Sequence, residues 1–343
     1  MAMIDGTSGN DTLLGTILDD ELRGLGGDDL LRGRAGDDRL NGGSGFDLMV
    51  GRAGGDVYFV DSELDRIREF AGEGIDSVNS SVSFRLQRGI ENLRLTGTAE
   101  SGRGNDLDNR IIADQDNADR VANVLNGGEG ADFMSGGWGS DTYFVDNPGD
   151  TIEEDGSDID TVRTTVSYTL AGSAFGEFVE NMVLIRSDAI DGTGNGFNNR
   201  IVGNDANNVI KGELGRDALI GGAGDDSLYG GGANDRLFGG VGNDGFYFEE
   251  LSSFADRIVD FSSTDDAVFL DRAVFTQIEE GALDPESFVI GTEAQDANDR
   301  VIYDPDSGWV RYDPDGSGGQ TFNVFLTLPP GTVIEHTDFV GYG

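Results

Sequence analysis

The chain has 343 residues, of which 65 are acidic and 23 basic, so its formal net charge is −42, and it contains 55 glycines and no cysteine. This charge repels phosphate and argues against nucleic acid and anionic membrane surfaces as partners. The composition excludes disulfides, thiolate zinc sites and a cysteine nucleophile, and the sequence has no apolar stretch long enough to span a bilayer.

The first block, residues 1–60, repeats every nine residues from Gly6 onwards. The fourth place is glycine in five of its six units, and the eighth place is always large and apolar. Each unit therefore predicts a tight glycine-rich turn followed by a short strand with one inward side chain. The sixth place is always aspartate: Asp11, Asp20, Asp29, Asp38, Asp47 and Asp56. The start of the chain lacks the basic and apolar regions of a Sec-type signal, so we expect any export to use another route.

Two connecting segments, 61–121 and 146–193, lack the strict repeat but resemble each other. The stretch from Asp56 to Asp61 recurs 85 positions later, from Asp141 to Asp146. Runs of alternating apolar residues within these segments predict strands. We therefore expect continued solenoid coils with looser turns, not separate globular domains.

The nine-residue register returns in a short middle block, 122–145, and in a third block, 194–248. Aspartate again takes the sixth place in most of their units: Asp132, Asp141, Asp217, Asp226, Asp235 and Asp244. Asparagine replaces it at three positions, Asn123, Asn199 and Asn208. Because an amide lowers the negative charge of a site, we expect weak metal binding or none at these turns.

The C-terminal segment, 249–343, contains no nonapeptides. Its pattern predicts strands over 257–261, 268–270, 288–290 and 300–303, with hairpin turns rich in aspartate, proline and glycine. A helix is predicted over 274–280, ended by Gly281. We interpret this segment as a β-rich domain that follows the coils.

Two nonapeptide units make one full coil, so the sixth-place aspartates of units n and n+2 lie beside each other, eighteen residues apart in sequence. Stacked coils are separated by about 4.7–4.9 Å, and carboxylates this close repel by roughly 1–4 kcal/mol per pair. A hard divalent cation between them reverses the sign. Calcium fits best, since it accepts six to eight oxygens and a glycine-rich turn can supply backbone carbonyls. The sequence thus predicts several calcium ions and a chain largely disordered without them.

These units resemble the G-G-x-G-x-D-x-U-x repeat of the hemolysin-type RTX family. The resemblance implies an all-β parallel β-roll, a right-handed β-solenoid, with calcium bound between turns and export by a type I secretion apparatus. It also implies that residues 249–343 form a β-rich capping domain with the secretion signal. By the same resemblance the metal ligands are the sixth-place aspartates, together with carbonyls of turn glycines: Gly27, Gly36, Gly45, Gly224 and Gly242.

We therefore interpret the chain as a secreted calcium-binding protein, extracellular or at the cell surface, that interacts with surface polysaccharide or matrix. An enzyme is not expected, because a single histidine excludes a His-Glu-x-x-His site and no Gly-x-Ser-x-Gly occurs. A polysaccharide-active enzyme that uses carboxylates alone stays open. The alternative function is an accessory or polysaccharide-binding module of a secreted enzyme system.

Overall fold

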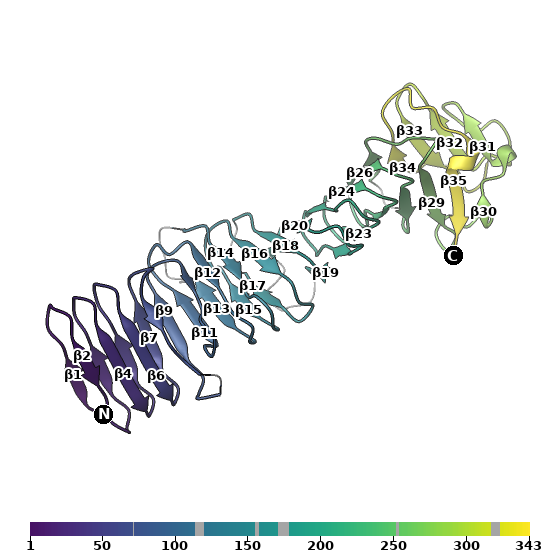
Figure 1. Ribbon diagram of the computed structural model, residues 1–343. Helices are drawn as coiled ribbons and strands as arrows, with labels where there is room; N and C mark the ends of the chain where they lie inside the picture. The colour runs from purple at the N-terminus through teal and green to yellow at the C-terminus, as the bar shows by residue number, and fades with distance from the viewer. Residues whose placement is uncertain (71, 114–119, 155–157, 171–177, 252–253, 317–322) are drawn as a thin grey trace. The chain divides into compact units, whose positions relative to one another are not determined.

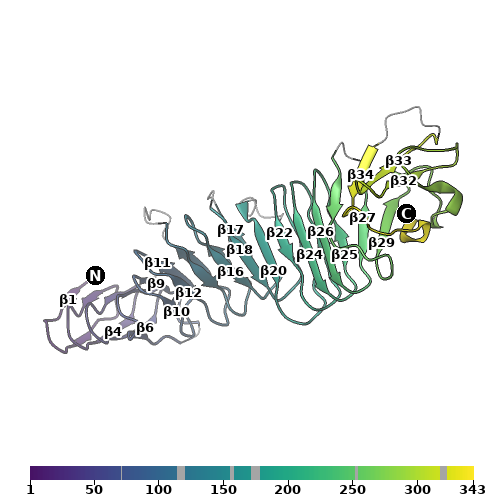
Figure 2. The ribbon, with the colours of Figure 1, turned by 90° about the horizontal axis from the view of Figure 1, so that it is seen from above.

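The strands of the nonapeptide blocks lie where the repeat places them, around the eighth residue of each unit. The computed structural model describes residues 1–343 apart from 71, 114–119, 155–157, 171–177, 252–253 and 317–322. The chain divides into two units: unit 1 comprises Met1–Arg163 and Ser173–Val179, and unit 2 comprises Thr164–Gly172 and Glu180–Gly343. Each unit contains a parallel β-solenoid, which confirms the predicted fold class (Figures 1 and 2).

Unit 1 is a stack of coils in which odd-numbered strands form one sheet. This sheet contains, in order, β1 (Met3–Asp5), β3 (Glu21–Arg23), β5 (Arg39–Asn41), β7 (Val57–Val60), β9 (Ser77–Ser80), β11 (Asn92–Leu95), β13 (Arg110–Ala113), β15 (Phe133–Ser135) and β17 (Thr151–Glu153). The even-numbered strands that complete the coils are β2 (Thr12–Leu14), β4 (Leu30–Ala35), β6 (Leu48–Ala53), β8 (Arg66–Ile67), β10 (Phe84–Arg85), β12 (Ser101–Arg103), β14 (Val124–Asn126), β16 (Thr142–Val145) and β18 (Thr161–Thr164). Strands thus continue through the connecting segment 61–121.

The register of these sheets follows the repeat. Leu13 of β2 pairs with Leu31 of β4, and the parallel pair β1 and β3 has the same eighteen-residue offset. Each strand of the first block points one eighth-place side chain into the coil, and the set is buried: Leu13, Leu22, Leu31, Leu40, Met49 and Tyr58. The core of the coil is therefore a narrow column of single apolar side chains.

Unit 2 also stacks parallel strands in two sheets, and antiparallel strands follow towards the C-terminus. One sheet contains β19 (Tyr168–Thr169), β21 (Gly192–Thr193), β23 (Val209–Lys211), β25 (Ser227–Tyr229), β27 (Gly245–Phe248), β29 (Ala267–Asp271), β35 (Phe339–Tyr342) and β30 (Gly281–Ala282). The other contains β20 (Asn181–Leu184), β22 (Arg200–Val202), β24 (Ala218–Ala223), β26 (Arg236–Val241), β28 (Asp256–Ile258), β34 (Asn323–Thr327), β33 (Trp309–Tyr312), β32 (Val301–Asp304) and β31 (Phe288–Ile290). Antiparallel pairs appear only towards the C-terminus among the pairings described, as between β32 and β33.

The C-terminal strands extend the two sheets of unit 2. β34 pairs in parallel with β28, and β35 pairs in parallel with β29, so both sheets continue beyond the last nonapeptide. Two 3₁₀ helices, η2 (Pro285–Ser287) and η3 (His336–Asp338), connect these strands. No helix among the described residues is both long enough and apolar enough to cross a bilayer.

The helix predicted over 274–280 is wrong. The backbone N–H groups of Val274 and Phe275 both donate to the carbonyl of Asp271, and that of Ile278 donates to Phe275, which gives consecutive turns. Seven residues with several β-branched side chains are too few to sustain an isolated helix. Phe275 and Ile278 are instead buried and anchor the turns to the core.

Candidate metal centre

The sixth-place aspartates form columns along the coils, linked by hydrogen bonds between one rung and the next. The backbone N–H of Asp29 donates to Oδ1 of Asp47 at 2.8 Å, and that of Asp38 donates to Oδ1 of Asp56 at 2.8 Å. In unit 2 the N–H of Asp217 donates to Asp235 at 2.8 Å, and that of Asp226 to Asp244 at 3.0 Å. Each carboxylate thus uses one oxygen to hold the preceding rung.

The second carboxylate oxygen of most column members has no hydrogen-bond partner in the described structure, although it is buried. The residues with such an Oδ2 atom are Asp29, Asp38, Asp47, Asp56, Asp76, Asp132, Asp141, Asp217, Asp226, Asp235 and Asp244. All of them are at most 3% exposed. Burying a carboxylate oxygen without a partner costs on the order of several kcal/mol of folding free energy. This recurring pattern therefore indicates that a cation binds at the columns.

Glycine is needed at the first place of the unit because the carboxylate occupies the space of a side chain. A Cβ atom at Gly42 would overlap the Oδ2 and Cγ atoms of Asp47, and one at Gly33 would overlap Asp38. The repeat therefore keeps a glycine where the sixth-place carboxylate folds back over its own turn.

Fourth-place glycines stack eighteen residues apart, next to these carboxylates in sequence. Gly27, Gly36, Gly45, Gly224 and Gly242 all have positive φ, between 97° and 150°. A Cβ atom at Gly45 would overlap the carbonyl oxygen of Gly27, and one at Gly242 would overlap that of Gly224. Since only glycine adopts this conformation at low cost, these places bring backbone carbonyls of successive turns close together, as a carbonyl-lined cation site requires.

Burial raises the pKa values of several column aspartates, which opposes their ionisation. Burial raises the pKa of Asp38 and Asp47 to about 6, although backbone hydrogen bonds partly counteract it. Burial, with the charges of Asp38 and Glu69 added, raises the pKa of Asp56 to about 8. Burial also raises the pKa values of Asp217 and Asp226, to about 7. A bound cation would remove this penalty on the charged form.

The ends of the columns differ from their middles. Oδ2 of Asp11 accepts hydrogen bonds from the backbone N–H and the hydroxyl of Thr7, and Oδ2 of Asp20 accepts the same pair from Thr16. At the far end, Oδ2 of Asp65 accepts from the backbone N–H groups of Asp61 and Ser62. Protein groups therefore satisfy the carboxylates at these ends, and the need for a cation concentrates in the interior of each column.

The columns include six aspartates outside the predicted set, four of which also depart from the nine-residue step. Asp56 is followed in its column by Asp76, twenty residues later, and Asp235 by Asp256, twenty-one residues later. The full set is Asp65, Asp76, Asp150, Asp160, Asp256 and Asp266. Every member keeps an aspartate two residues before a buried apolar residue, as in Asp76-Ser77-Val78, and this local signal could have found them.

The asparagines at sixth places are satisfied by the protein. The side-chain amide of Asn123 donates to the carbonyl of Ala99 at 2.8 Å, and that of Asn208 donates to Ile190 at 2.6 Å. Oδ1 of Asn208 accepts the backbone N–H of Asn204, and Oδ1 of Asn199 accepts that of Asn195. An amide at these places can donate where a carboxylate cannot, so these rungs have less need of a cation.

The donor set of the columns consists of carboxylate and carbonyl oxygens. In the part of the chain that the structure describes, the carboxylate cluster contains neither histidine nor cysteine, and no lysine or arginine forms an ion pair with Asp29, Asp38, Asp47 or Asp56. Oxygen donors in flexible, glycine-rich turns suit calcium, whereas magnesium requires a smaller octahedral site. The residues present therefore fit calcium.

Comparison with known proteins agrees with this chemistry. The family model of the RTX calcium-binding nonapeptide repeat (four copies) matches residues 3–16, 14–49, 32–65, 120–151, 193–228 and 212–246. Over 56 residues the chain is 39% identical to the endo-1,3-1,4-beta-glycanase ExsH of Rhizobium meliloti (strain 1021). That match covers 16% of this chain and 12% of the glycanase. The matched residues lie in all three nonapeptide blocks, so the chain contains several copies of the RTX calcium-binding nonapeptide repeat.

Proposed function

We propose that the protein is secreted, that its coils fold when calcium binds outside the cell, and that the folded solenoid interacts with the cell surface or matrix. The observation that carries this proposal is the series of buried Oδ2 atoms without hydrogen-bond partners, from Asp29 to Asp244. A calcium ion beside these oxygens would balance the negative charge of the carboxylates. The proposed ligands are the interior column aspartates and the carbonyls of turn glycines such as Gly27 and Gly224.

The thin core of the coils supports ion-dependent folding. A nine-residue unit buries one large side chain, such as Leu31 or Leu40, while all of its backbone must be ordered. Removing the cation leaves the aligned carboxylates to repel one another. Calcium binding and folding of the coil are therefore expected to occur together.

Coupling of folding to calcium suits a type I export route. Extracellular modules bind calcium with dissociation constants of about 10⁻⁴ to 10⁻³ M, far above the free calcium of a cytosol. The chain would stay unfolded before export and fold after it, with segment 249–343 as the proposed carrier of the secretion signal. This coupling and the match to RTX calcium-binding repeats support the proposed localisation outside the cell.

Circular dichroism of the full chain tests the proposal directly. Protein prepared with chelator and then brought to about 1 mM calcium should change from a disordered spectrum to a β spectrum, and magnesium at the same concentration should not replace calcium. A β spectrum of the same amplitude in chelator would contradict calcium-coupled folding.

A second candidate function is an accessory, polysaccharide-binding module of a secreted enzyme system. The partial match to a protein named as a glycanase favours it, as does a groove of about 710 Å³ in unit 1, whose lining includes Arg85, Arg88 and Arg103 together with Asp106, Glu129 and Asp146. Arg85 and Arg103 are exposed neighbours on β10 and β12, and such adjacent cations are costly unless an anion binds them. The Arg85–Arg103 pair is the feature that supports a polysaccharide with acidic groups as the ligand.

A glycan array probed with and without calcium separates the two functions. If the chain is a polysaccharide-binding module, we expect calcium-dependent binding to acidic polysaccharides, and we expect the double variant Arg85→Gln, Arg103→Gln to lose it. The variant Arg32→Gln, which changes one of the two exposed arginines of β4, serves as the control. Retained binding in the double variant would place the ligand elsewhere, and absence of any glycan binding would remove the module from consideration.

A further inference from the structure

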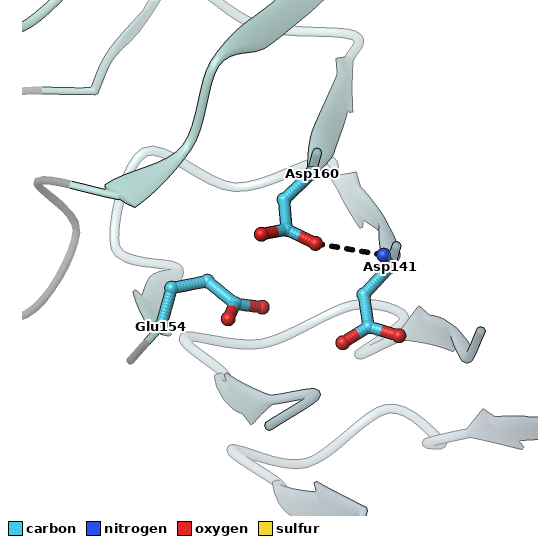
Figure 3. A group of neighbouring side chains, drawn as sticks. All are labelled: Asp141, Glu154 and Asp160. Atoms are coloured by element: carbon cyan, nitrogen blue, oxygen red, sulfur yellow. Dashed lines mark hydrogen bonds between the residues drawn. The ribbon is translucent and has the colours of Figure 1, made fainter. Parts of the chain in front are cut away.

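A third carboxylate joins the aspartate column at one point of unit 1. Asp141 precedes β16, Glu154 follows β17 and Asp160 precedes β18. One oxygen from each of these three side chains lies within 4.8 Å of the other two, and all three residues are buried. Figure 3 shows the carboxylates facing a common centre, with the backbone N–H of Asp141 donating to Asp160 at 2.7 Å.

Glu154 stands where the repeat has its first-place glycine. It follows Gly136 by eighteen residues, so it occupies the corresponding place one coil later. A side chain at this place points into the coil, towards the sixth-place carboxylates. The site therefore differs from the ordinary column, in which the first place contributes no side chain.

A buried tyrosine holds Glu154 in this position. The eighth-place Tyr143 is fully buried, and its hydroxyl oxygen accepts the backbone N–H of Gly136 at 2.8 Å. Its own proton is donated to Oε1 of Glu154. Because the tyrosine has one proton to donate, the contact orients the glutamate as an acceptor.

The local charge calls for a cation. Oδ2 of Asp141 is buried and has no hydrogen-bond partner in the described part of the chain. Three carboxylates in one buried place are stable together only when protonated or when a cation lies among them.

The 85-residue repeat supplies a natural comparison. Tyr58 and Glu69 stand in the same relation as Tyr143 and Glu154, with the Tyr58 hydroxyl donating to Glu69. Oε1 of Glu69 also accepts backbone N–H groups from Gly51 and Arg52, each at 3.0 Å. Glu69 does not form a three-carboxylate cluster with Asp56 and Asp76 among the described residues, so its role is to hold the turn.

We propose that Asp141, Glu154 and Asp160 form an inner binding site for one calcium ion, in which a glutamate from the core side of the coil joins two aspartates of the column. The class of ligand follows from three hard oxygen donors. The proposal adds a site to the calcium-binding function and depends on it only for the identity of the ion.

Calcium titration calorimetry of the full chain tests this site with a matched pair of variants. Glu154→Gln should bind one calcium ion fewer than the unchanged chain, or bind one ion about tenfold more weakly or worse. Glu69→Gln should keep the full number of ions. In both variants the side-chain carbonyl oxygen of glutamine can still accept the tyrosine proton, and circular dichroism in calcium checks that each has folded.

Terbium, a luminescent substitute for calcium, gives a second readout. Tyr143 lies next to the inner site, so exciting tyrosine should produce terbium emission that falls in Glu154→Gln and in Tyr143→Phe but not in Glu69→Gln. If Glu154→Gln binds as many ions as the unchanged chain with the same affinities, the inner site is wrong while the turn sites stand. If the unchanged chain binds a single ion that Glu154→Gln loses, the inner site stands and the turn sites fail. Equal loss in both glutamate variants would overturn the inner site.

Discussion

The first nonapeptide block and the C-terminal segment bury their residues in different ways. A coil of the first block encloses single side chains such as Leu22 and Leu40 beside partnerless Oδ2 atoms of aspartate. The C-terminal segment packs rings against one another, with Phe275 at 5.1 Å from both Tyr312 and Phe325, measured between ring centroids. We therefore expect ion binding at the carboxylates to provide most of the stability of the coil, and apolar contacts to provide most of the stability of the segment.

The largest expected effect is that of calcium removal. Chelation should make the backbone amides of the first block exchange rapidly with solvent, because repulsion among the columns is then uncompensated. Amides of β32 and β33 in the C-terminal segment should stay protected. Hydrogen exchange read by mass spectrometry measures both regions in one sample, and continued protection of the first block in chelator would remove the contrast between the two regions.

A cavity in the aromatic core should act independently of calcium. Phe275→Ala removes a fully buried ring and should lower the free energy of unfolding of the C-terminal segment by about 3–5 kcal/mol. Trp309 fluorescence during denaturant unfolding, in a Trp138→Phe background, reports on this segment. Phe46→Ala, at a side chain 57% exposed, is the control. A loss that disappears at high calcium would contradict the prediction.

A methyl group at the first place of a repeat should damage the coil by a smaller amount. Gly42→Ala places a Cβ atom against the Asp47 carboxylate and should lower the free energy of unfolding by roughly 1–3 kcal/mol through overpacking. We expect the same variant to bind calcium more weakly. Gly9→Ala is the matched control, because a Cβ atom there meets only the Thr7 hydroxyl, at 3.9 Å. Calcium titrations followed by circular dichroism compare the two midpoints, and equal midpoints would count against the proposed geometry.

The smallest expected effect is that of low pH, which should partly replace calcium in stabilising the coil. The folded pKa of Asp38 is about 6 and that of Asp56 about 8, both raised by burial above the ordinary value of 3.8. Folded carboxyls then bind more protons than unfolded ones, so the metal-free coil gains stability as the pH falls from 8 to about 4. Over the same range protons compete with calcium, and its affinity falls. Circular dichroism in chelator should show more β structure at pH 5 than at pH 8, and the reverse order would contradict this account.

The regular part of the fold could be predicted because each local signal agreed with the next. Glycine, aspartate and a large apolar residue recur at fixed places, so the pairing of Leu13 with Leu31 follows from counting residues. The stacking of Asp29 on Asp47 follows from the same count.

The irregular part escaped this reasoning because loop length varies while strand stacking does not. Asp76 and Asp256 join their columns after turns of unusual length, so a fixed step of nine or eighteen residues passes over them. The helix predicted over 274–280 failed because tertiary burial of Phe275 outweighed a weak local pattern. Glu154 was missed because its role depends on Tyr143, which the repeat treats only as an apolar residue.

Crystals of the full chain grown with calcium would test the central claim most directly, through an anomalous difference map. The account predicts peaks next to the Oδ2 atoms of interior column members such as Asp38, Asp47 and Asp226, within about 2.3–2.6 Å of carboxylate and carbonyl oxygens. Ordered coils with only water beside those oxygens would contradict it.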